Sequence, residues 1–471
     1  MLADQFYIGG EWLPAIGTER VEVRNPATGD IIGTASLGNE ADADRAVAAA
    51  RAAFATWQHS NIEERLALLR RMRACFEEAA ADIAAHLVRE VGLIGLVAGG
   101  QGMMSLSHFD TMLDLLPTYA FSQRQDAMVE LVREPVGVVV AITSWNAPVS
   151  QMLCKIVPAI AAGCTVVVKP SEQAPLCGIL LARAMDKAGI PPGVFNLVNG
   201  RGADCGRRLA EHSDVDMVSM TGSVPGGGAM AAAAAPTIKR VHQELGGKSA
   251  NILLPDVDFA RVVPQSVLSC MMNAGQVCAA PTRLIVPESR FAEVAELAVN
   301  AADALVVGPP DDPATNIGPL SNAAQFTRVN ALLEAALADG QPLLTGGPGR
   351  PAHLAHGFYA RPTVFGPVAS DAEIARQEIF GPVLCILTYR DEDEAVRIAN
   401  DSVFGLAAYV QSADPQTARR VAGRLRAGYV TINFPGWTAA APFGGYGQSG
   451  NGKQYGVWGF EEFLETKAIV A

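Results

Sequence analysis

The sequence carries little charge for its length and no excess of basic residues. Asp, Glu, Lys and Arg together make up 18% of the 471 residues, against about 25% in an average soluble protein. Because 48 acidic residues outnumber 36 basic ones, the chain lacks the broad basic surface that binding to nucleic acid requires. Its 49% content of hydrophobic residues excludes a disordered chain and allows a large buried core.

Signals for export and membrane insertion are also missing. Residues 1–7 show neither the basic start nor the apolar stretch of a signal peptide. The longest apolar runs, such as those at 136–143 and 229–235, are far shorter than the roughly 18 residues that a membrane-spanning helix needs. We therefore expect a cytoplasmic protein that binds neither membranes nor nucleic acid.

The sequence has no pattern of paired metal ligands. The eight cysteines form no CxxC pair and no zinc-ligand spacing. In a reducing compartment most of them are expected to be buried thiols, and at most one or two to be chemically active. His353 and His356 could share a helix face, but Pro351 and Gly357 mark that segment as a loop. We predict no metal site.

What the sequence does contain is a regular alternation of strand and helix patterns. Short apolar runs alternate with helical segments between 136 and 244, and the pattern recurs between 250 and 432. Such alternation indicates βαβ units and parallel sheets. We therefore expect an α/β protein with two Rossmann-like parallel-sheet domains that meet just after Glu244. The first set of strands is expected at 136–142, 165–168, 194–198, 216–220 and 240–244.

Helical periodicity fills much of the chain before these strands. Apolar residues recur at helical spacing over 40–57 and 62–91. The glycine-rich segment 92–102 interrupts the pattern, and helical spacing returns over 103–117. The sequence therefore predicts two long helices, a break, and a third helix.

Two segments that follow predicted strands could bind a nucleotide, since ligands of parallel sheets bind at the carboxyl ends of the strands. Lys169 and Glu172 could hold the hydroxyl groups of a ribose. The turn at 221–228 opens a helix whose free backbone N–H groups could bind a pyrophosphate. Taken alone, each segment could equally be an ordinary turn. The GxGxxG match at 445–450 follows no clear strand, and we reject it as a dinucleotide fingerprint.

Three further residues could carry catalysis. Cys278 ends a predicted helix among small residues, and a thiolate nucleophile needs such open space together with a lowered pKa. Glu244 lies at a strand end beside glycines and could act as a general base. Asn146 follows a strand, and its amide could donate to an oxyanion. Alone, the cysteine could instead be an inert buried thiol and the glutamate an ordinary surface acid.

Taken in their order along the chain, these segments resemble those of the NAD(P)-dependent aldehyde dehydrogenase superfamily. Two motifs carry the resemblance, Glu-Leu-Gly-Gly at 244–247 and Gly-Gln-Val-Cys at 275–278. Supporting segments lie at 25–29, 378–382, 404–406 and 442–450. The resemblance covers about residues 6–468, and segment 92–102 departs from the family pattern.

The resemblance implies a two-stage oxidation of an aldehyde to a carboxylic acid. Cys278 would attack the aldehyde carbonyl as a thiolate. The Asn146 side-chain amide and the Cys278 backbone N–H would hold the oxyanion of the hemithioacetal. Hydride transfer to the nicotinamide would leave a thioester. Glu244, as a partly desolvated carboxylate with a raised pKa, would activate the water that hydrolyses this thioester.

The resemblance also implies a cofactor site. Lys169 and Glu172 match the ligands of the adenine ribose. Glu172 would repel a 2′-phosphate, so we favour NAD, while NADP stays possible. Glu378 matches the ligand of the nicotinamide ribose. The residues implied to contact the cofactor are Lys169, Glu172, Trp145, Gly222, Ser223, Gly227, Glu378 and Phe380.

Matched by position, the substrate tunnel would be apolar, with one amide and no lysine or arginine. Its residues would be Ala147, Gln151, Cys154, Met271, Met272, Ala279 and the loop 434–437 with Trp437. We therefore hypothesise a bulky, uncharged aldehyde, aromatic or aliphatic. A semialdehyde dehydrogenase, a CoA-acylating dehydrogenase and a catalytically silent relative are the alternatives. Glu244 argues against CoA acylation, because that reaction needs no water-activating base.

The resemblance implies domain borders and an oligomer as well. The NAD-binding domain would comprise residues 1–116 and 136–245, and the catalytic domain residues 246–446. Residues 117–135 and 455–471 would form a small β oligomerisation module. We expect a homodimer or a homotetramer.

Overall fold

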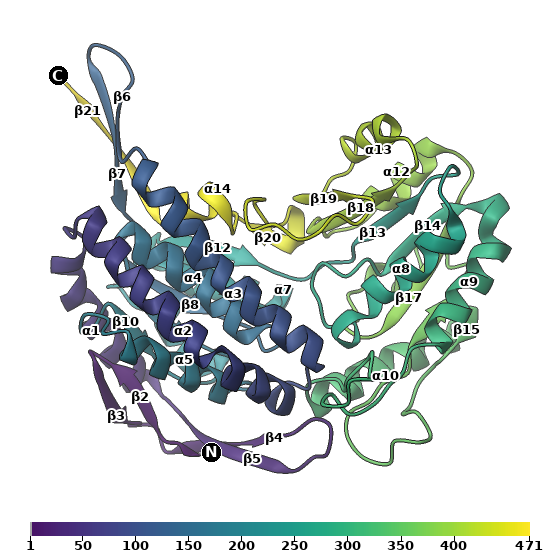
Figure 1. The fold of residues 1–471 in the computed structure, drawn as a ribbon, viewed down its shortest axis with the longest axis horizontal. Helices are drawn as coiled ribbons and strands as arrows, with labels where there is room; N and C mark the ends of the chain where they lie inside the picture. The colour runs from purple at the N-terminus through teal and green to yellow at the C-terminus, as the bar shows by residue number, and fades with distance from the viewer. Residues whose placement is uncertain (1) are drawn as a thin grey trace.

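The computed structural model describes residues 2–471, and two large sheets with their covering helices form most of it (Figure 1). The first sheet contains, in spatial order, β20 (Gly450–Asn451), β12 (Arg240–Glu244), β11 (Met217–Thr221), β8 (Val138–Ile142), β9 (Thr165–Lys169), β10 (Phe195–Leu197), β2 (Gln5–Ile8) and β3 (Glu11–Pro14). The second contains β15 (Leu343–Thr345), β16 (Thr363–Phe365), β17 (Val383–Tyr389), β14 (Arg283–Pro287), β13 (Ala250–Leu253), β18 (Ala407–Gln411) and β19 (Tyr429–Ile432). The predicted α/β fold with two parallel-sheet domains is confirmed.

The centre of the first sheet is parallel and buried. β12, β11, β8, β9 and β10 run in one direction, whereas β2, β3 and β20 pair antiparallel at the edges. Every residue of β8 and β9 is buried, as expected where helices cover both faces of a parallel sheet. Helices α4 (Pro148–Ala162) and α5 (Pro175–Lys187) follow these two strands, and α2 (Ile62–Glu90) packs against both helices.

The strand predicted at 136–142 is wrong at its start. β7 (Val129–Pro135) belongs to a different sheet, and β8 begins at Val138. Gly137 lies between them with a φ of 132°, a conformation that favours glycine. A Cβ at this position would lie 1.9 Å from Asp216 Oδ2, and that carboxylate accepts a hydrogen bond from the Val138 N–H at 2.7 Å. The chain therefore passes from one sheet into the other at this glycine.

The predicted break at 92–102 is also wrong, because α3 (Gly95–Leu115) runs through most of it. The glycines at 95, 99, 100 and 102 face open space, and each costs roughly 1 kcal/mol of helix propensity. Packing against α2 and α4 offsets this cost. The residues that α3 buries recur at helical spacing, and they are Ala98, Gln101, Ser105, His108, Phe109 and Met112.

The second sheet is parallel except at its edge strand β15. Helices α8 (Phe259–Met271), α9 (Phe291–Asp303) and α12 (Glu392–Asn400) pack against it. Sequence reasoning missed β15 and β16, because each has only three residues and turn-forming residues surround them. α8 ends at Met271, and α13 (Pro415–Ala422) follows β18.

A small sheet of β6 (Ser122–Arg124), β7 and β21 (Leu464–Val470) projects from the body of the molecule (Figure 1). α14 (Gly456–Glu461) lies outside this sheet and packs on α4 and α3. The C-terminal segment 455–471 therefore contributes to two places in the fold. The domain borders and the role of the small sheet in pairing subunits stay predictions.

The described residues, 2–471, hold no helix that is both long and apolar enough to cross a membrane. Within the same range, no group of three or more His, Cys, Asp and Glu side chains is arranged to hold a metal ion. All eight cysteines are free thiols, and only Cys75 and Cys278 are not fully buried. These two are the cysteines that solvent can reach.

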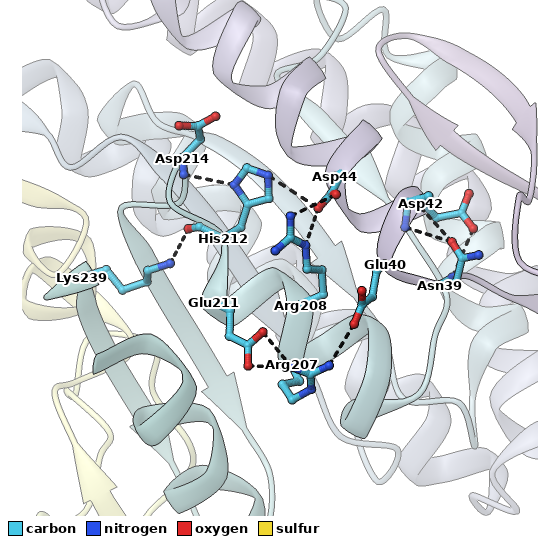
Figure 2. Close-up of polar contacts among 11 residues, drawn as sticks. Asn39, Glu40, Asp42, Asp44, Arg207, Arg208, Glu211, His212, Asp214 and Lys239 are labelled. Atoms are coloured by element: carbon cyan, nitrogen blue, oxygen red, sulfur yellow. Dashed lines mark hydrogen bonds and ion pairs between the residues drawn. The ribbon is translucent and has the colours of Figure 1, made fainter. Parts of the chain in front are cut away.

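Polar contacts tie α1 (Glu40–Trp57) to α6 (Arg207–Glu211) at the surface (Figure 2). Arg208 pairs with Asp44 at 2.6 Å, and both side chains are over one-third exposed. Asp42, two residues earlier on α1, differs because its side chain is fully buried. Figure 2 places Asp42 beside Asn39 at the start of the helix, where the two side chains form a capping box.

The Asp42 carboxylate is surrounded by donors. It accepts hydrogen bonds from the backbone N–H groups of Ile16, Gly17 and Asn39 at distances of 2.9 to 3.2 Å. Arg45 adds an ion pair at 2.9 Å. A buried carboxylate with this many donors fixes the N-terminal segment onto the first turn of α1.

Replacing Asp42 with Asn is expected to destabilise the fold, whereas Asp44→Asn is expected to have little effect. Asp42→Asn places an amide nitrogen against buried N–H donors and removes the charge opposite Arg45, which together cost about 2–4 kcal/mol. The exposed Asp44 pair contributes less than about 1 kcal/mol. Urea unfolding followed by circular dichroism tests this, and equal unfolding midpoints for the two variants would contradict it.

Candidate active site

The strands of the first sheet end side by side, and the loops that follow them carry predicted site residues. In the register of the sheet, Ile142 of β8 pairs with Lys169 of β9 and with Met220 of β11. Thr221 pairs in turn with Glu244 of β12. The carboxyl edge of the sheet, where ligands of α/β proteins bind, therefore brings together the segments after residues 142, 169, 221 and 244.

Cys278 comes to this edge from the second sheet through a tight turn. Just after α8, Asn273 and Ala274 both have a φ of 53°, and Gly275 has a φ of 71°. A Cβ on Gly275 would lie 2.0 Å from the Gly381 carbonyl oxygen, so only glycine fits there. This run of left-handed residues ends the helix and turns the chain sharply just before Cys278.

The two sheets contact each other around Cys278. A Cβ on Gly247 would lie 2.6 Å from the Cys278 carbonyl oxygen, and Asn146 Nδ2 donates to the Gln276 carbonyl at 3.0 Å. The structure therefore brings the 275–278 motif together with the 244–247 motif and with Asn146. The roles of these residues stay predictions.

The Asn146 side chain is held in one orientation. It is buried, and its Oδ1 accepts hydrogen bonds from Gln151 Nε2 at 3.0 Å and from Ser144 Oγ at 2.7 Å. The Nδ2 group carries two hydrogens, of which the Gln276 carbonyl takes one, so the other is left for a ligand. Gln151, expected among the substrate residues, instead uses its amide within the protein to orient Asn146.

The Glu244 carboxylate is buried without a hydrogen-bond partner. It is 4% exposed, and neither of its oxygens is hydrogen-bonded within the described residues. Burial raises its pKa to about 8, although the nearby positive charges of Lys155 and Lys453 oppose the shift. A buried carboxylate with free lone pairs and a pKa near neutrality has the properties of a general base.

Cys278 is only partly buried, yet its pKa is high. Burial raises the pKa of the thiol to about 12, and the negative charges of Glu244 and Glu378 raise it further than the backbone N–H donors of Cys278 and Ala279 lower it. Burial therefore disfavours the thiolate, the form in which a cysteine acts as a nucleophile. The resting group is a thiol, which has to lose its proton before or during attack.

The predicted ribose ligands lie together at the end of β9. Lys169 is buried, and its Nζ donates to the carbonyl oxygens of Pro170 and Gly200, each at 2.9 Å. The same Nζ lies 3.7 Å from Glu172 Oε2, whose side chain is 27% exposed. Burial lowers the pKa of Lys169. The carboxylate is thus free to accept from a ligand while the amine is fixed beside it.

The turn after β11 opens α7 (Val224–Ala234) as predicted. Ser223 is the N-cap, and its Oγ accepts from the Gly226 N–H at 3.3 Å. Packing explains why a glycine stands at 227, because a Cβ there would lie 2.6 Å from Leu245. Gly222 instead lies near the flexible end of Met220. The Gly222 N–H donates to the Glu244 carbonyl oxygen at 3.0 Å, so it is not free for a ligand, and Gly227 allows close helix packing.

Glu378 and Phe380 lie in the loop before β17. Glu378 Oε1 accepts from the Gly247 N–H at 3.0 Å, and a Cβ on Gly246 would lie 2.2 Å from Glu378 Oε2. Phe380 has a φ of 59°, and its ring meets the edge of Trp145 at 5.4 Å. The paired glycines of the 244–247 motif therefore let Glu378 approach the end of β12.

These groups together fit a dinucleotide. A fixed lysine and a partly exposed glutamate suit the hydroxyl groups of one ribose, and the N-terminus of α7 suits phosphate. Glu378 is a second carboxylate for a second ribose, and Trp145 and Phe380 supply flat faces for an aromatic ring. They lie at or just after the ends of β8, β9 and β11 and in the loop before β17.

The residues predicted for the substrate tunnel are dispersed around Asn146 and α4. Ala147 and Cys154 lie at the start and middle of α4, and Met271 is buried at the end of α8. Met272 is 47% exposed and Trp437 is 45% exposed. The Ala279 carbonyl accepts from Tyr409 Oη at 2.8 Å.

Sequence reasoning missed several residues near the site. Gln101 and His108 of α3 are buried, and Gln101 Nε2 donates to the Asn146 carbonyl at 3.4 Å. Lys155 is buried on α4, and its Nζ has no partner within the described residues. Tyr455 has a φ of 68° and stacks on His108. A helix over 92–102 would have been the sequence signal for Gln101, whereas Lys155 lies on α4 and Tyr455 just before α14.

Comparisons with known proteins agree with this geometry. The sequence profile of the aldehyde dehydrogenase family matches residues 12–469. Among curated proteins, the 3-succinoylsemialdehyde-pyridine dehydrogenase of a Pseudomonas species is 48% identical over 468 residues, which are 99% of this chain and 98% of that protein.

Solved structures are similar over the whole chain. A mutant of aldehyde dehydrogenase C from Pseudomonas syringae, in complex with NAD+ and octanal, has a TM-score of 0.98 and 50% identity, covering 99% of this chain and 96% of its own. Mycobacterium tuberculosis aldehyde dehydrogenase complexed with NAD+ has a TM-score of 0.97 and 38% identity, covering 100% of this chain and 98% of its own.

Proposed function

The chain belongs to the aldehyde dehydrogenase family, and from this premise we propose that it oxidises a bulky, uncharged aldehyde to the carboxylic acid with NAD, through a thioester on Cys278. The observation that carries the proposal is the meeting of Cys278, Glu244 and the free hydrogen of the Asn146 amide where the two sheets contact. A thiol, a base and an oxyanion donor are the parts that acyl transfer requires.

The first stage is attack by Cys278. Because its side chain is partly exposed, the thiol proton can leave to solvent as sulfur adds to the aldehyde carbon. The developing oxyanion is held by the second Nδ2 hydrogen of Asn146, whose orientation Gln151 fixes, and by the Cys278 N–H. Both donors are uncharged, so they stabilise the oxyanion at any working pH.

NAD, when bound, accepts the hydride from the hemithioacetal carbon. Lys169 and Glu172 would hold one ribose, Glu378 the other, and Trp145 and Phe380 would contact the nicotinamide ring. Glu244 then removes a proton from a water molecule that attacks the thioester, which releases the carboxylic acid and returns the Cys278 thiol. Two of the structures similar to this chain are complexes with NAD+, which supports this cofactor.

The substrate class follows from the chemistry of the predicted tunnel and from the relatives. The predicted tunnel residues include no lysine or arginine that could pair with a carboxylate. One similar structure contains octanal, and a curated relative is named for a pyridine-bearing semialdehyde. Both are consistent with a bulky aldehyde that carries no charge at its far end.

A panel of aldehydes with NAD tests the proposal. We expect a higher kcat/KM for octanal and for benzaldehyde-type substrates than for succinic semialdehyde. A clear preference for succinic semialdehyde would instead favour the semialdehyde alternative. NADH formation that depends on added CoA would favour CoA acylation, and no NADH with any aldehyde would favour a silent relative.

Glu172→Gln is expected to shift cofactor use toward NADP. The carboxylate would repel a 2′-phosphate, and a neutral amide removes that repulsion, so the ratio of kcat/KM for NADP to that for NAD should rise about tenfold, equivalent to about 1.4 kcal/mol. Glu211→Gln, a surface acid on α6, should keep the wild-type ratio. An unchanged ratio in Glu172→Gln would count against Glu172 as the ribose ligand.

We also propose the domain borders, the oligomeric state and the location in the cell from membership of the same family. We place the NAD-binding domain at 1–116 and 136–245, and the catalytic domain at 246–446. We propose a homodimer or homotetramer paired through the small sheet of 117–135 and 455–471, and a cytoplasmic location. Exposed apolar side chains on this sheet support subunit pairing, since Met128, Ile469 and Val470 are 61%, 45% and 66% exposed.

A further inference from the structure

A buried histidine that is not among the predicted site residues lies beside Glu244. Side chains two positions apart on a strand point to the same face of the sheet, so His242 and Glu244 of β12 share one face. His242 Nε2 lies 3.8 Å from Glu244 Oε1, and the two side chains are 2% and 4% exposed. The ring and the carboxylate therefore face each other in a region that excludes solvent.

The opposite side of the ring is held by the neighbouring strand. Ser219 of β11 pairs with His242 in the register of the sheet, and its Oγ lies 3.3 Å from His242 Nδ1. By contrast, His242 Nε2 has no hydrogen-bond partner within residues 2–471, and neither does either carboxylate oxygen of Glu244. The ring nitrogen that is left over is thus the one that faces the carboxylate.

Two glycines near the C-terminus leave room for this pair. A Cβ on Gly444 would lie 2.6 Å from Glu244 Oε1, and a Cβ on Gly452 would lie 2.5 Å from His242 Cδ2. Any larger residue at either position would therefore displace the carboxylate or the ring. The glycines admit both groups into one recess at the end of β12.

The groups that act electrostatically on Glu244 come from several elements, and they are Lys155, Lys453, Glu462, Cys154, Cys278 and Tyr455. Burial lowers the pKa of His242 well below its usual value, and the charges of Lys155 and Lys453 lower it further. The ring is therefore neutral near pH 7. A neutral imidazole carries a single N–H, on either Nδ1 or Nε2.

The charge of Glu244 determines which ring nitrogen carries the proton. An ionised carboxylate repels a lone pair and attracts a donor, so it favours the proton on His242 Nε2. The Ser219 hydroxyl then donates to Nδ1. The 3.8 Å separation exceeds the length of a hydrogen bond by less than about 1 Å. A small rotation of either side chain therefore brings the Nε2–H group into contact with the carboxylate.

We propose that His242 is a positioning residue for the base, and that its Nε2–H binds the ionised Glu244 carboxylate and holds it in this recess between turnovers. Donation to the ionised form favours that form, so His242 opposes the effect of burial on the same carboxyl. One carboxylate oxygen stays free to accept from the attacking water. This inference rests on the proposed function and names a residue on which the proposed base depends.

Two substitutions of His242 separate hydrogen-bond donation from packing. His242→Leu stays apolar and buried but removes the donor, so the midpoint of the rise of kcat with pH should increase by about one unit, and kcat at pH 7 should fall about tenfold. His242→Gln keeps an N–H donor at the end of its side chain, and its midpoint should stay close to that of the wild type. His59→Leu, which alters an exposed histidine, should keep the wild-type kcat and midpoint.

Ser219→Ala tests the same contact without changing the histidine. It removes the hydroxyl that holds Nδ1, so the midpoint should rise, but by less than in His242→Leu. A lower kcat at every pH with an unchanged midpoint in both variants would show that these side chains act only through packing, and would overturn the inference. An equal rise of the midpoint in His242→Leu and His242→Gln would also overturn it.

An infrared titration separates this inference from the proposed reaction. The C=O stretching band of the protonated Glu244 carboxyl, identified by its absence in Glu244→Gln, reports ionisation without substrate or turnover. A midpoint that is higher in His242→Leu and restored in His242→Gln supports the inference even if no aldehyde is oxidised, which would refute only the proposed function. Equal midpoints in wild type and His242→Leu would overturn the inference even if aldehydes are oxidised.

Discussion

Cys278→Ala is expected to abolish aldehyde oxidation while NAD still binds. Cys278 is the partly exposed thiol that the structure brings to Glu244 and the Asn146 amide, and removing such a nucleophile costs at least about a thousandfold in kcat. The predicted cofactor ligands lie on other loops, after β9, β11 and before β17. The dissociation constant for NAD should therefore change less than about threefold, measured by titration calorimetry.

Cys75→Ala is the matched control for this experiment. Cys75 is the other cysteine that is not fully buried, but it lies on α2, which carries none of the predicted site residues. It should keep wild-type turnover and should still lose activity when treated with iodoacetamide. Persistent oxidation by Cys278→Ala would refute the assignment of the nucleophile.

The features that the sequence predicted well are those that depend on short local patterns of residues. Runs of valine that follow a glycine mark β8 and β9, and a parallel sheet then places the carboxyl ends of its strands at one edge. Lys169 and Glu244 are both last residues of such strands. Their proximity follows from strand order alone, without any knowledge of side-chain packing.

The features that it missed depend on tertiary contacts. The glycines of 92–102 oppose a helix locally, and α3 forms there because α2 and α4 bury one of its faces. His108 and Gln101 reach the candidate site only because that helix forms. Tyr455 takes a backbone conformation that no local preference predicts. The high pKa of Cys278 arises from burial and from two carboxylates distant in sequence.

The pKa of Glu244 predicts how the rate of thioester hydrolysis changes with pH. A general base acts only in its ionised form, and burial raises the pKa of this carboxyl to about 8. Below that pH most molecules carry a protonated Glu244, so the rate of thioester hydrolysis should fall about tenfold for each unit of decreasing pH. Above it the rate should level off. The wild-type kcat should therefore rise with pH through about 8 wherever hydrolysis limits turnover.

Glu244→Gln removes the base but keeps the shape and burial of the side chain. We expect kcat to fall by about 10²–10⁴ and the pH dependence near 8 to disappear. Because hydride transfer precedes hydrolysis, one NADH per site should still form in a burst, and the acyl group should accumulate on Cys278. Stopped-flow absorbance measures the burst, and mass spectrometry of acid-quenched protein measures the adduct.

Two controls distinguish base catalysis from a structural effect of the substitution. Glu130→Gln, on the central strand β7 of the projecting sheet, should keep both the wild-type kcat and its rise near pH 8. Glu244→Asp retains a carboxylate with a shorter reach, so its kcat should fall while a rise with pH remains, because an ionisable base is still present. If Glu244→Gln kept the wild-type kcat, or if it lost the burst together with steady-state turnover, water activation by Glu244 would be wrong. In the second case the carboxyl would instead be needed at or before hydride transfer.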